Sequence, residues 1–195
     1  MGVKCLTEME IPEVVKVARG VFDYCLRSTI ANEQSIRCFE DYVTEENLTR
    51  RLNDGSLFLW GIYEQGHLVA VSGMQSEGHI TMLYVLPFLQ RHGFGKELLH
   101  TMRVFAGTKL NLSWVTVNAM PEWTADYFRK HKFSVMLSNA QAPGQYTALM
   151  AKTLNEVSYE PKELHQGWVI GITVAAILLS CGVAGGYVAF WLGLV

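Results

Sequence analysis

Apolar and polar residues alternate along the chain with two different periods, and each period predicts one kind of element. In the stretch IPEVVKVARGVFDYCL apolar residues recur at helical spacing, and Pro12 suits the first turn of a helix. Thr44 is a candidate N-cap for a second helix in TEENLTRRL, which the turn sequence NDG at 53–55 ends. A short strand is expected at 3–7, whereas 39–43 fits either kind of element.

Alternation typical of strands dominates the middle of the chain. Strands are expected at 57–63, 67–75 and 79–86, joined by the turn sequences QG at 65–66 and EG at 77–78. This spacing predicts an antiparallel meander of three strands.

The following part of the chain alternates between helix and strand. We expect a helix at about 93–106, a strand at 114–118, a helix at 121–132 and a last strand at 146–153. This order predicts an α/β (α+β) fold in which helices flank a mixed, mostly antiparallel sheet. The folded domain is expected to span residues 1–153.

The C-terminal segment has a different composition. No Asp, Glu, Lys or Arg occurs in 168–195, and about 20 apolar residues suffice for a helix to cross a bilayer. We therefore expect one transmembrane helix at 168–195, preceded by a juxtamembrane linker at 154–167. Lys152, Lys162 and His165 precede this span, which predicts a single-pass protein of the cell membrane with its folded domain in the cytoplasm.

Charge and cysteine spacing exclude further classes. A formal net charge of −2 provides no basic field for nucleic acid. The 4 cysteines form neither a CxxC pair nor a zinc-ligand spacing with histidine, so we expect reduced thiols and no metal site.

The most informative stretch is 83–99, LYVLPFLQRHGFGKELL, in which an apolar strand breaks at a proline and a helix starts after a glycine-containing loop. The first N–H groups of a helix have no intrahelical partner and its N-terminal end is partly positive, so such a junction binds anions. Gly93 and Gly95 let a phosphate approach the backbone without an intervening Cβ. The sequence therefore predicts a phosphate cradle.

The same stretch resembles the acetyl-CoA site of the GNAT superfamily of N-acetyltransferases, with its pattern V-x-P-x-x-Q/R-x-x-G-x-G-x-x-L-L. The segment VTVNAMPEWTADYFRKHKF resembles the second signature of that family, and the resemblance extends from residue 1 to about 153. It implies the GNAT fold and acetyl-CoA as co-substrate, with the pantetheine along a strand and the pyrophosphate on the loop. The cofactor-binding residues that it implies are Leu83, Tyr84, Val85, Gln90, Arg91, His92, Gly93, Phe94, Gly95, Lys96, Asn118 and Phe128.

The sequence departs from the family at one catalytic position. The family commonly has a tyrosine in Y-x-x-x-G-F as the acid that protonates the leaving thiolate, but this chain has Phe128 there, and Lys132 in place of the glycine. Phe128 carries no proton to donate. Tyr127 is the candidate acid, although it points about 100° away on a helix, and packing is its alternative role.

The sequence also offers more than one candidate for the base that accepts the proton of the amine. Glu77 and His79 enter the expected strand at 79–86 and are candidate catalytic bases, and Glu122 is a further one. Each of these residues also fits an ordinary turn or cap, as Asn118 fits a cap for the turn that follows it.

Three interpretations remain at this point, and one of them is a small membrane protein whose folded domain is unrelated to this family and binds no coenzyme A. The first is an N-acetyltransferase that transfers acetyl from acetyl-CoA to a primary amine of a small molecule or protein by direct attack. The alternative is a catalytically weak acyl-CoA-binding module that acts by protein interaction through its membrane anchor. The small-residue pairs GxxxG at 167–171 and 182–186 favour helix association, as in a homodimer, although small residues are common in such spans.

Overall fold

The computed structural model describes residues 2–30, 33–139 and 147–154, which belong to one compact unit, Met1–Glu156. The predicted transmembrane helix at 168–195 and its linker after residue 154 lie outside the described residues. None of the helices in the described part of the chain is long and apolar enough to span a membrane.

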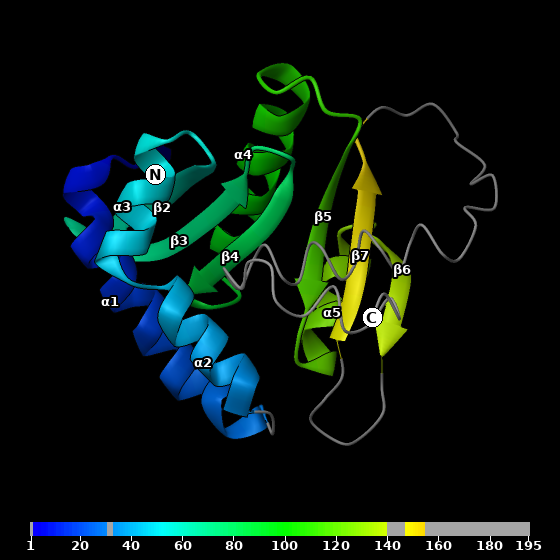
Figure 1. The fold of residues 1–195 in the computed structure, drawn as a ribbon, viewed down its shortest axis with the longest axis horizontal. Helices are drawn as coiled ribbons and strands as arrows, with labels where there is room; N and C mark the ends of the chain where they lie inside the picture. Colours follow the sequence, from blue (N-terminus) through cyan, green and yellow to red (C-terminus); the bar gives the residue numbers. More distant parts are fainter. Residues whose placement is uncertain (1, 31–32, 140–146, 155–195) are drawn as a thin grey trace, which may run out of the picture. The chain divides into compact units, whose positions relative to one another are not determined.

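The described strands form a single mixed sheet with the order β1-β2-β3-β4-β5-β7-β6 (Figure 1). The pair β4–β5 is parallel and the other pairs are antiparallel. The strands are β1 (Val3–Cys5), β2 (Leu57–Glu64), β3 (His67–Gln75), β4 (His79–Val85), β5 (Trp114–Ala119), β6 (Ser134–Asn139) and β7 (Thr147–Thr153).

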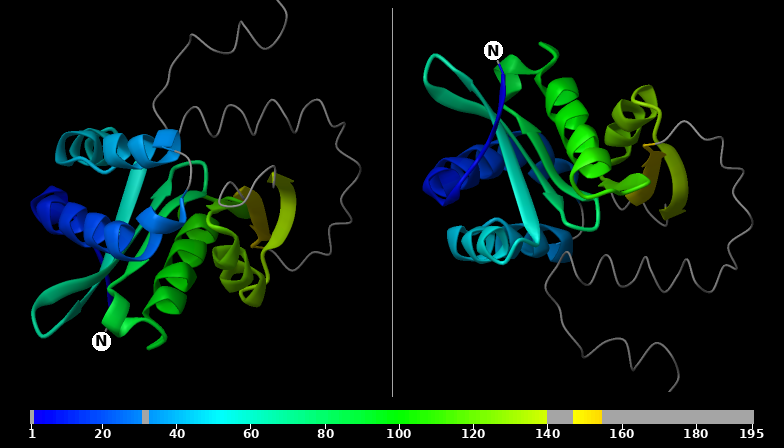
Figure 2. Two further views of the ribbon diagram at one scale, coloured as in Figure 1. Left: turned by 90° about the horizontal axis from the view of Figure 1, so that it is seen from below. Right: turned by 90° about the horizontal axis from the view of Figure 1, so that it is seen from above.

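Helices cover both faces of this sheet. Helices α1 to α3 lie on one face and α4 and α5 on the other, as the two views of Figure 2 show. The helices are α1 (Ile11–Val21), α2 (Glu33–Tyr42), α3 (Glu45–Asn53), α4 (Phe94–Thr108) and α5 (Glu122–Lys130). A short helical turn, η4 (Pro87–Leu89), follows β4.

The sequence explains why the helices lie where they do. Helix α1 buries Ile11, Val14, Ala18 and Val21, which recur at helical spacing on one side. Thr44 caps α3, since its Oγ1 accepts a hydrogen bond from the Asn47 N–H at 3.2 Å.

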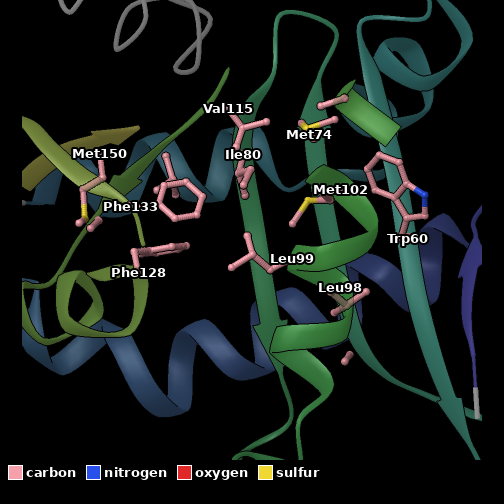
Figure 3. Close-up of a cluster of buried hydrophobic side chains, with 14 of the residues drawn as sticks. Trp60, Met74, Ile80, Leu98, Leu99, Met102, Val115, Phe128, Phe133 and Met150 are labelled. Atoms are coloured by element: carbon pink, nitrogen blue, oxygen red, sulfur yellow. The ribbon is translucent and has the colours of Figure 1, made fainter. Parts of the chain in front are cut away.

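Two hydrophobic cores result, one on each face of the sheet. The first lies between the sheet and helices α4 and α5, and Figure 3 shows its side chains, among them Leu99, Met102 and Phe128. The second lies under α1 to α3 and includes Val14, Leu48 and other buried apolar residues. Each face of the sheet therefore has a hydrophobic core of its own.

The expected fold class is confirmed, and so is the three-stranded meander. The ambiguous residues 39–43 belong largely to α2, whereas the strand β6 was not predicted. A register shift between Val135 and Leu137 breaks the alternation in β6. Val135 and Met136 are both exposed, so no inward-outward pattern marks this edge strand in the sequence.

Candidate functional site

The parallel strands β4 and β5 pair over only two residues and then part. His79 lies opposite Thr116 and Ile80 opposite Val117, and the described sheet has no further β4–β5 partners. Figure 1 shows the two strands diverging toward their carboxyl ends. In this section the backbone groups of β4 that face β5 have no strand partner in the described sheet. They are therefore available to an extended ligand.

A β-bulge lies where the strands part. A register shift between Gly73 and Met74 of β3 leaves Thr81 as an extra residue on β4. The Thr81 hydroxyl accepts a hydrogen bond from the Tyr42 hydroxyl at 3.0 Å and donates one to the Gly73 carbonyl at 3.3 Å. These contacts hold the bulge between β3 and helix α2, and a bulge changes the direction of the backbone groups next to it.

The loop after β4 leads to the N-terminus of α4. Arg91 and Gly93 have left-handed backbones, with φ of 66° and 94°. The first hydrogen bond within α4 runs from the Glu97 N–H to the Gly93 carbonyl at 3.0 Å. The N–H groups of residues 94–96 therefore precede the first intrahelical bond and face an anion site. A Cβ added at Gly93 would meet no atom within 4 Å, so the space beside it is open.

Positive side chains surround this cradle. Arg91, His92 and Lys96 are exposed to solvent. The loop is held in shape by short contacts, since His92 Nδ1 lies 2.9 Å from the Gln90 carbonyl. Gln90 Nε2 donates to the Val85 carbonyl at 3.1 Å, which ties the loop to the end of β4. These residues fit a phosphate-bearing ligand in charge and in geometry.

The predicted cofactor residues of β4 direct their side chains to the two faces of the sheet. Leu83 and Val85 pack on the α4 side and Tyr84 packs on the α1 side. Burial raises the pKa of the Tyr84 hydroxyl, so that this group stays protonated. Phe94 is also buried, at 8% exposure. A ligand between β4 and β5 would therefore meet the backbone of Leu83, Tyr84 and Val85 rather than their side chains.

His79 lies at the closed end of the opening and is buried, at 6% exposure. Its Nδ1 lies 2.8 Å from Thr116 Oγ1, and its Nε2 lies 3.4 Å from Asn118 Nδ2. In the tautomer with the proton on Nδ1, His79 donates to Thr116 and accepts from Asn118. Burial lowers the pKa of His79 to about 4, so the ring is neutral at pH 7.

Glu77 is exposed in the turn between β3 and β4. Ser76 Oγ donates a hydrogen bond to Glu77 Oε2 at 3.0 Å. The negative charge of Glu77 raises the pKa of His79 and so opposes the larger effect of burial. Glu77 and His79 are two residues apart in the chain, in the turn before β4 and at the first residue of this strand. Glu122 begins α5, and its side chain lies outside the described part of the structure.

Tyr127 lies against the start of α4. Its hydroxyl is 2.9 Å from the position that a Cβ on Gly95 would take, and Val85 Cγ2 is 3.8 Å from the same position. The hydroxyl oxygen is buried and has no hydrogen-bond partner among the described residues. Burial raises the pKa of Tyr127 to about 12. Tyr127 therefore belongs to the cradle at the carboxyl end of β4.

The candidate acid and the candidate bases consequently lie at opposite ends of β4. His79 and Val85 are the first and last residues of this strand. At about 3.3 Å per residue, they are separated by roughly 20 Å. A single thioester cannot lie beside both ends, so the structure does not bring Tyr127 together with Glu77 and His79.

Phe128 packs in the core rather than beside the opening. It is 6% exposed, and its ring centroid lies 5.4 Å from that of Phe133 and 5.3 Å from that of Tyr127. Figure 3 shows the Phe128 ring among the core side chains, near Phe133. Its assignment to the cofactor followed from its place in the motif, and its burial gives it a packing role instead.

Three residues of the site were not identified from the sequence. Thr81 forms the bulge, Tyr42 holds it and Thr116 pairs with His79. Thr81 left no signal in the sequence, because a polar residue between Ile80 and Met82 fits the ordinary alternation of a strand. The contacts of Tyr42 and Thr116 depend on strand register and helix packing, which a single sequence does not reveal.

The site contains no cluster typical of a metal centre. In the ranges 2–30, 33–139 and 147–154, no group of three or more His, Cys, Asp or Glu side chains is close enough to hold a metal ion.

Solved structures with a similar fold share this arrangement of elements. The PaiA N-acetyltransferase from Thermoplasma acidophilum, in complex with coenzyme A, has a TM-score of 0.65 at 15% identity, over 78% of this chain and 99% of that chain. The ribosomal-protein-S18-alanine N-acetyltransferase from Escherichia coli has 0.59 at 13% identity, over 84% and 97%. The aminoglycoside 6'-N-acetyltransferase from Enterococcus faecium has 0.59 at 10% identity, over 83% and 100%.

At these identities the likeness shows the fold alone. A comparison with curated protein sequences gave no match. A family model for the acetyltransferase (GNAT) domain, however, matches residues 28–154, which is more than half of the chain. The matched segment includes the opening between β4 and β5, the bulge and the cradle at α4. The chain therefore belongs to the GNAT family of acetyltransferases.

Proposed function

We propose that the chain is an acetyl-CoA-dependent N-acetyltransferase that acetylates a primary amine and is held at the cell membrane by its C-terminal segment. The observation that carries the proposal is the parting of β4 from β5 directly before the N-terminus of α4. This arrangement offers a strand backbone for the pantetheine and a helix N-terminus for the pyrophosphate. A solved structure of similar fold is a coenzyme A complex, which supports the same ligand.

The proposed reaction is a direct transfer. The amine nitrogen forms a bond to the thioester carbonyl carbon, the carbon–sulfur bond breaks, and the sulfur leaves as a thiolate. A backbone N–H of β4 near the bulge at Thr81 donates to the carbonyl oxygen as negative charge develops there. The exposed carboxylate of Glu77 takes the proton lost by the amine and releases it to solvent, and the thiolate takes a proton from solvent.

His79 does not act on the amine in this reaction, because its Nδ1 donates to Thr116 and its Nε2 accepts from Asn118. With a pKa of about 4 the ring is also a weak base, so it does not carry the proton away. Its role is to hold the side chains of Thr116 and Asn118 at the closed end of the opening. Glu77, which is exposed beside it, accepts the proton on the solvent side.

Turnover with a panel of amines tests this function. The full chain is incubated with acetyl-CoA and small polyamines, aminoglycosides, or peptides with free N-termini, and thiol release is followed together with the mass of the acetylated product. We expect at least one amine to be acetylated, and Gly93→Glu to abolish the activity. Binding of acetyl-CoA without transfer to any amine class would contradict catalysis.

One observation favours a second function, a catalytically weak acyl-CoA-binding module. The family's tyrosine position holds the buried Phe128, and the hydroxyl of Tyr127 lies at the cradle rather than near the closed end. Without an acid near the sulfur, transfer would be slow, although a thiolate leaves without one. The amine panel separates the two functions, because only the first yields product.

The membrane anchor rests on sequence alone. The uncharged segment 168–195 supports a transmembrane helix, and its small residues support pairing in a homodimer. The full chain is expected in the membrane fraction after alkaline washing. Release by that wash would contradict the anchor and leave the proposed transfer untouched.

A further inference from the structure

Arg51 lies near the end of helix α3 and contacts two further elements. Its Nη1 donates a hydrogen bond to Gln75 Oε1 at 3.1 Å, in the orientation of the Gln75 amide that pairs both of its polar groups. Its guanidinium carbon lies 4.9 Å from the centroid of the Tyr42 ring, which is a cation–π distance. Arg51 therefore joins α3 to the end of β3 and to the end of α2.

Gln75 carries the first of these contacts on to Glu77. Gln75 Nε2 donates to Glu77 Oε1 at 3.0 Å, and Ser76 Oγ donates to Glu77 Oε2 at 3.0 Å. Each oxygen of this carboxylate therefore accepts a hydrogen bond, although Glu77 is exposed. Gln75 is only 5% exposed, so its amide is confined between Arg51 and Glu77.

The turn that carries Glu77 is also attached to the end of α3. The Ser76 N–H donates to the Ser56 carbonyl at 3.2 Å, and Ser56 Oγ donates to the Arg51 carbonyl at 3.3 Å. The side chain and the main chain of Arg51 thus both lead to this turn. Because the turn is held at these points, the carboxylate of Glu77 is oriented before any substrate binds.

Tyr42 fixes the guanidinium that begins this chain of contacts. Its hydroxyl donates to Thr81 Oγ1 at 3.0 Å, so the ring is attached to the bulge on β4. Burial raises the pKa of the Tyr42 hydroxyl, which therefore stays protonated and remains a donor. A guanidinium stacks on an aromatic face while its planar donors stay available, so Arg51 can rest on Tyr42 and still bond Gln75.

We propose, on the basis of the proposed function, that Arg51 is a positioning residue of the transfer reaction. Through Gln75 it holds the carboxylate of Glu77 in the orientation in which this group takes the proton of the amine. Arg51 acts through these side chains rather than on the amine itself. A base accelerates proton transfer only when it is within reach and correctly aimed, so losing the support should slow turnover without weakening the binding of the donor.

Arg51→Gln removes the charge and the planar donors and leaves Glu77 in place. Release of the coenzyme A thiol is followed with the polyamine, aminoglycoside or peptide that the wild type acetylates fastest. We expect kcat to fall about tenfold, with an unchanged KM and Kd for acetyl-CoA, because the cradle lies at the other end of β4. Arg51→Lys keeps the charge and a donor and should recover most of the rate.

The matched control is Arg50→Gln, which makes the same change one residue earlier on α3. Arg50 is exposed and contacts Asn47 and Asp54 of its own helix end, so kcat should stay at the wild-type value.

A double variant tests whether Arg51 acts through Glu77. Glu77→Gln alone should lower kcat about 100-fold, and adding Arg51→Gln should lower it no further. Gln75→Met, which removes only the connecting amide, should reproduce the effect of Arg51→Gln.

The outcomes separate this inference from the proposed function. If Arg51→Gln leaves kcat unchanged, or lowers it equally in the presence of Glu77→Gln, the positioning role is overturned and the proposed function stands. If Arg51→Gln and Gln75→Met both lose affinity for acetyl-CoA along with kcat, their role is structural and the inference is overturned. If the wild type acetylates no amine, the proposed function fails and the inference fails with it.

Discussion

The two ends of β4 carry different kinds of binding groups. At the carboxyl end, the groups are the backbone N–H groups of 94–96, the open space at Gly93 and exposed cations, all within one short segment of the chain. At the amino end, they are polar side chains, with the buried His79 held between the half-buried Thr116 and Asn118 of another strand.

This difference has consequences for how each end tolerates change. A cradle of backbone groups needs a particular backbone path and a positive potential, and most of its side chains are exchangeable. A buried polar cluster needs each partner, since every member that loses one is left unsatisfied in the interior. Substitutions at the first end should act on ligand affinity, and substitutions at the second on pH dependence and turnover.

The largest effect is expected at Gly93. A glutamate at position 93 is strained, because its backbone must keep φ near +94°. It also places a negative charge beside the pyrophosphate. We expect the Kd for acetyl-CoA to rise about 100-fold or more, measured by calorimetry. The matched control is Gly66→Glu, at φ +83° in the β2–β3 turn, which adds the same charge and similar strain away from the cradle. If both variants lose affinity equally, the cradle is not the binding site.

The next effect concerns the acid stability of the closed end. Because the pKa of His79 is about 4 when folded and 6.5 when unfolded, the unfolded chain takes up a proton first as the pH falls. The free energy of unfolding should therefore fall by about 3 kcal/mol as the pH decreases from 6.5 to 4. Above pH 6.5 this contribution of the neutral ring is fully present. His79→Gln should remove this loss in urea unfolding experiments. The control variant His67→Gln, at an exposed histidine, should keep the wild-type dependence of stability on pH. The same pH dependence in His79→Gln would contradict the claim that burial lowers the pKa of His79.

A smaller effect is expected from restoring the family tyrosine. Phe128→Tyr places a hydroxyl in the core near Phe133, where it should lower the free energy of unfolding by about 1–3 kcal/mol without raising kcat. Phe88→Tyr makes the same chemical change at a residue that is 73% exposed and should be neutral. A clear rise of kcat in Phe128→Tyr would show that this position reaches the sulfur after all.

The smallest effect is expected at Tyr127. Since its hydroxyl is buried without a described partner, Tyr127→Phe should stabilise the ligand-free chain by about 1 kcal/mol in thermal or urea unfolding. Tyr24→Phe, at a residue that is 77% exposed, is the control. A large fall in kcat with unchanged affinity for acetyl-CoA would instead return Tyr127 to the role of the acid.

The sequence predicted the carboxyl end of β4 well because that end is local. Pro87, Gly93 and Gly95 lie within a few residues of one another, and their conformational preferences alone indicate a strand, a loop and a helix start. The meander and the Thr44 cap are local in the same sense.

The amino end could not be predicted in the same way. Contact of His79 with Thr116 depends on the register of two parallel strands, and the bulge at Thr81 depends on Tyr42 of α2. The direction of a helical side chain is equally hard to infer. Phe128 and Tyr127 are neighbours in sequence, yet packing sends one into the core and the other to the cradle.

Direct titration of the full chain with acetyl-CoA tests the central claim, that the cradle at the start of α4 is the donor site of an acetyltransferase. We predict saturable binding to one site, competed by coenzyme A and strongly weakened by Gly93→Glu but not by Gly66→Glu. Absence of binding at millimolar acetyl-CoA, with the chain folded, would contradict the account.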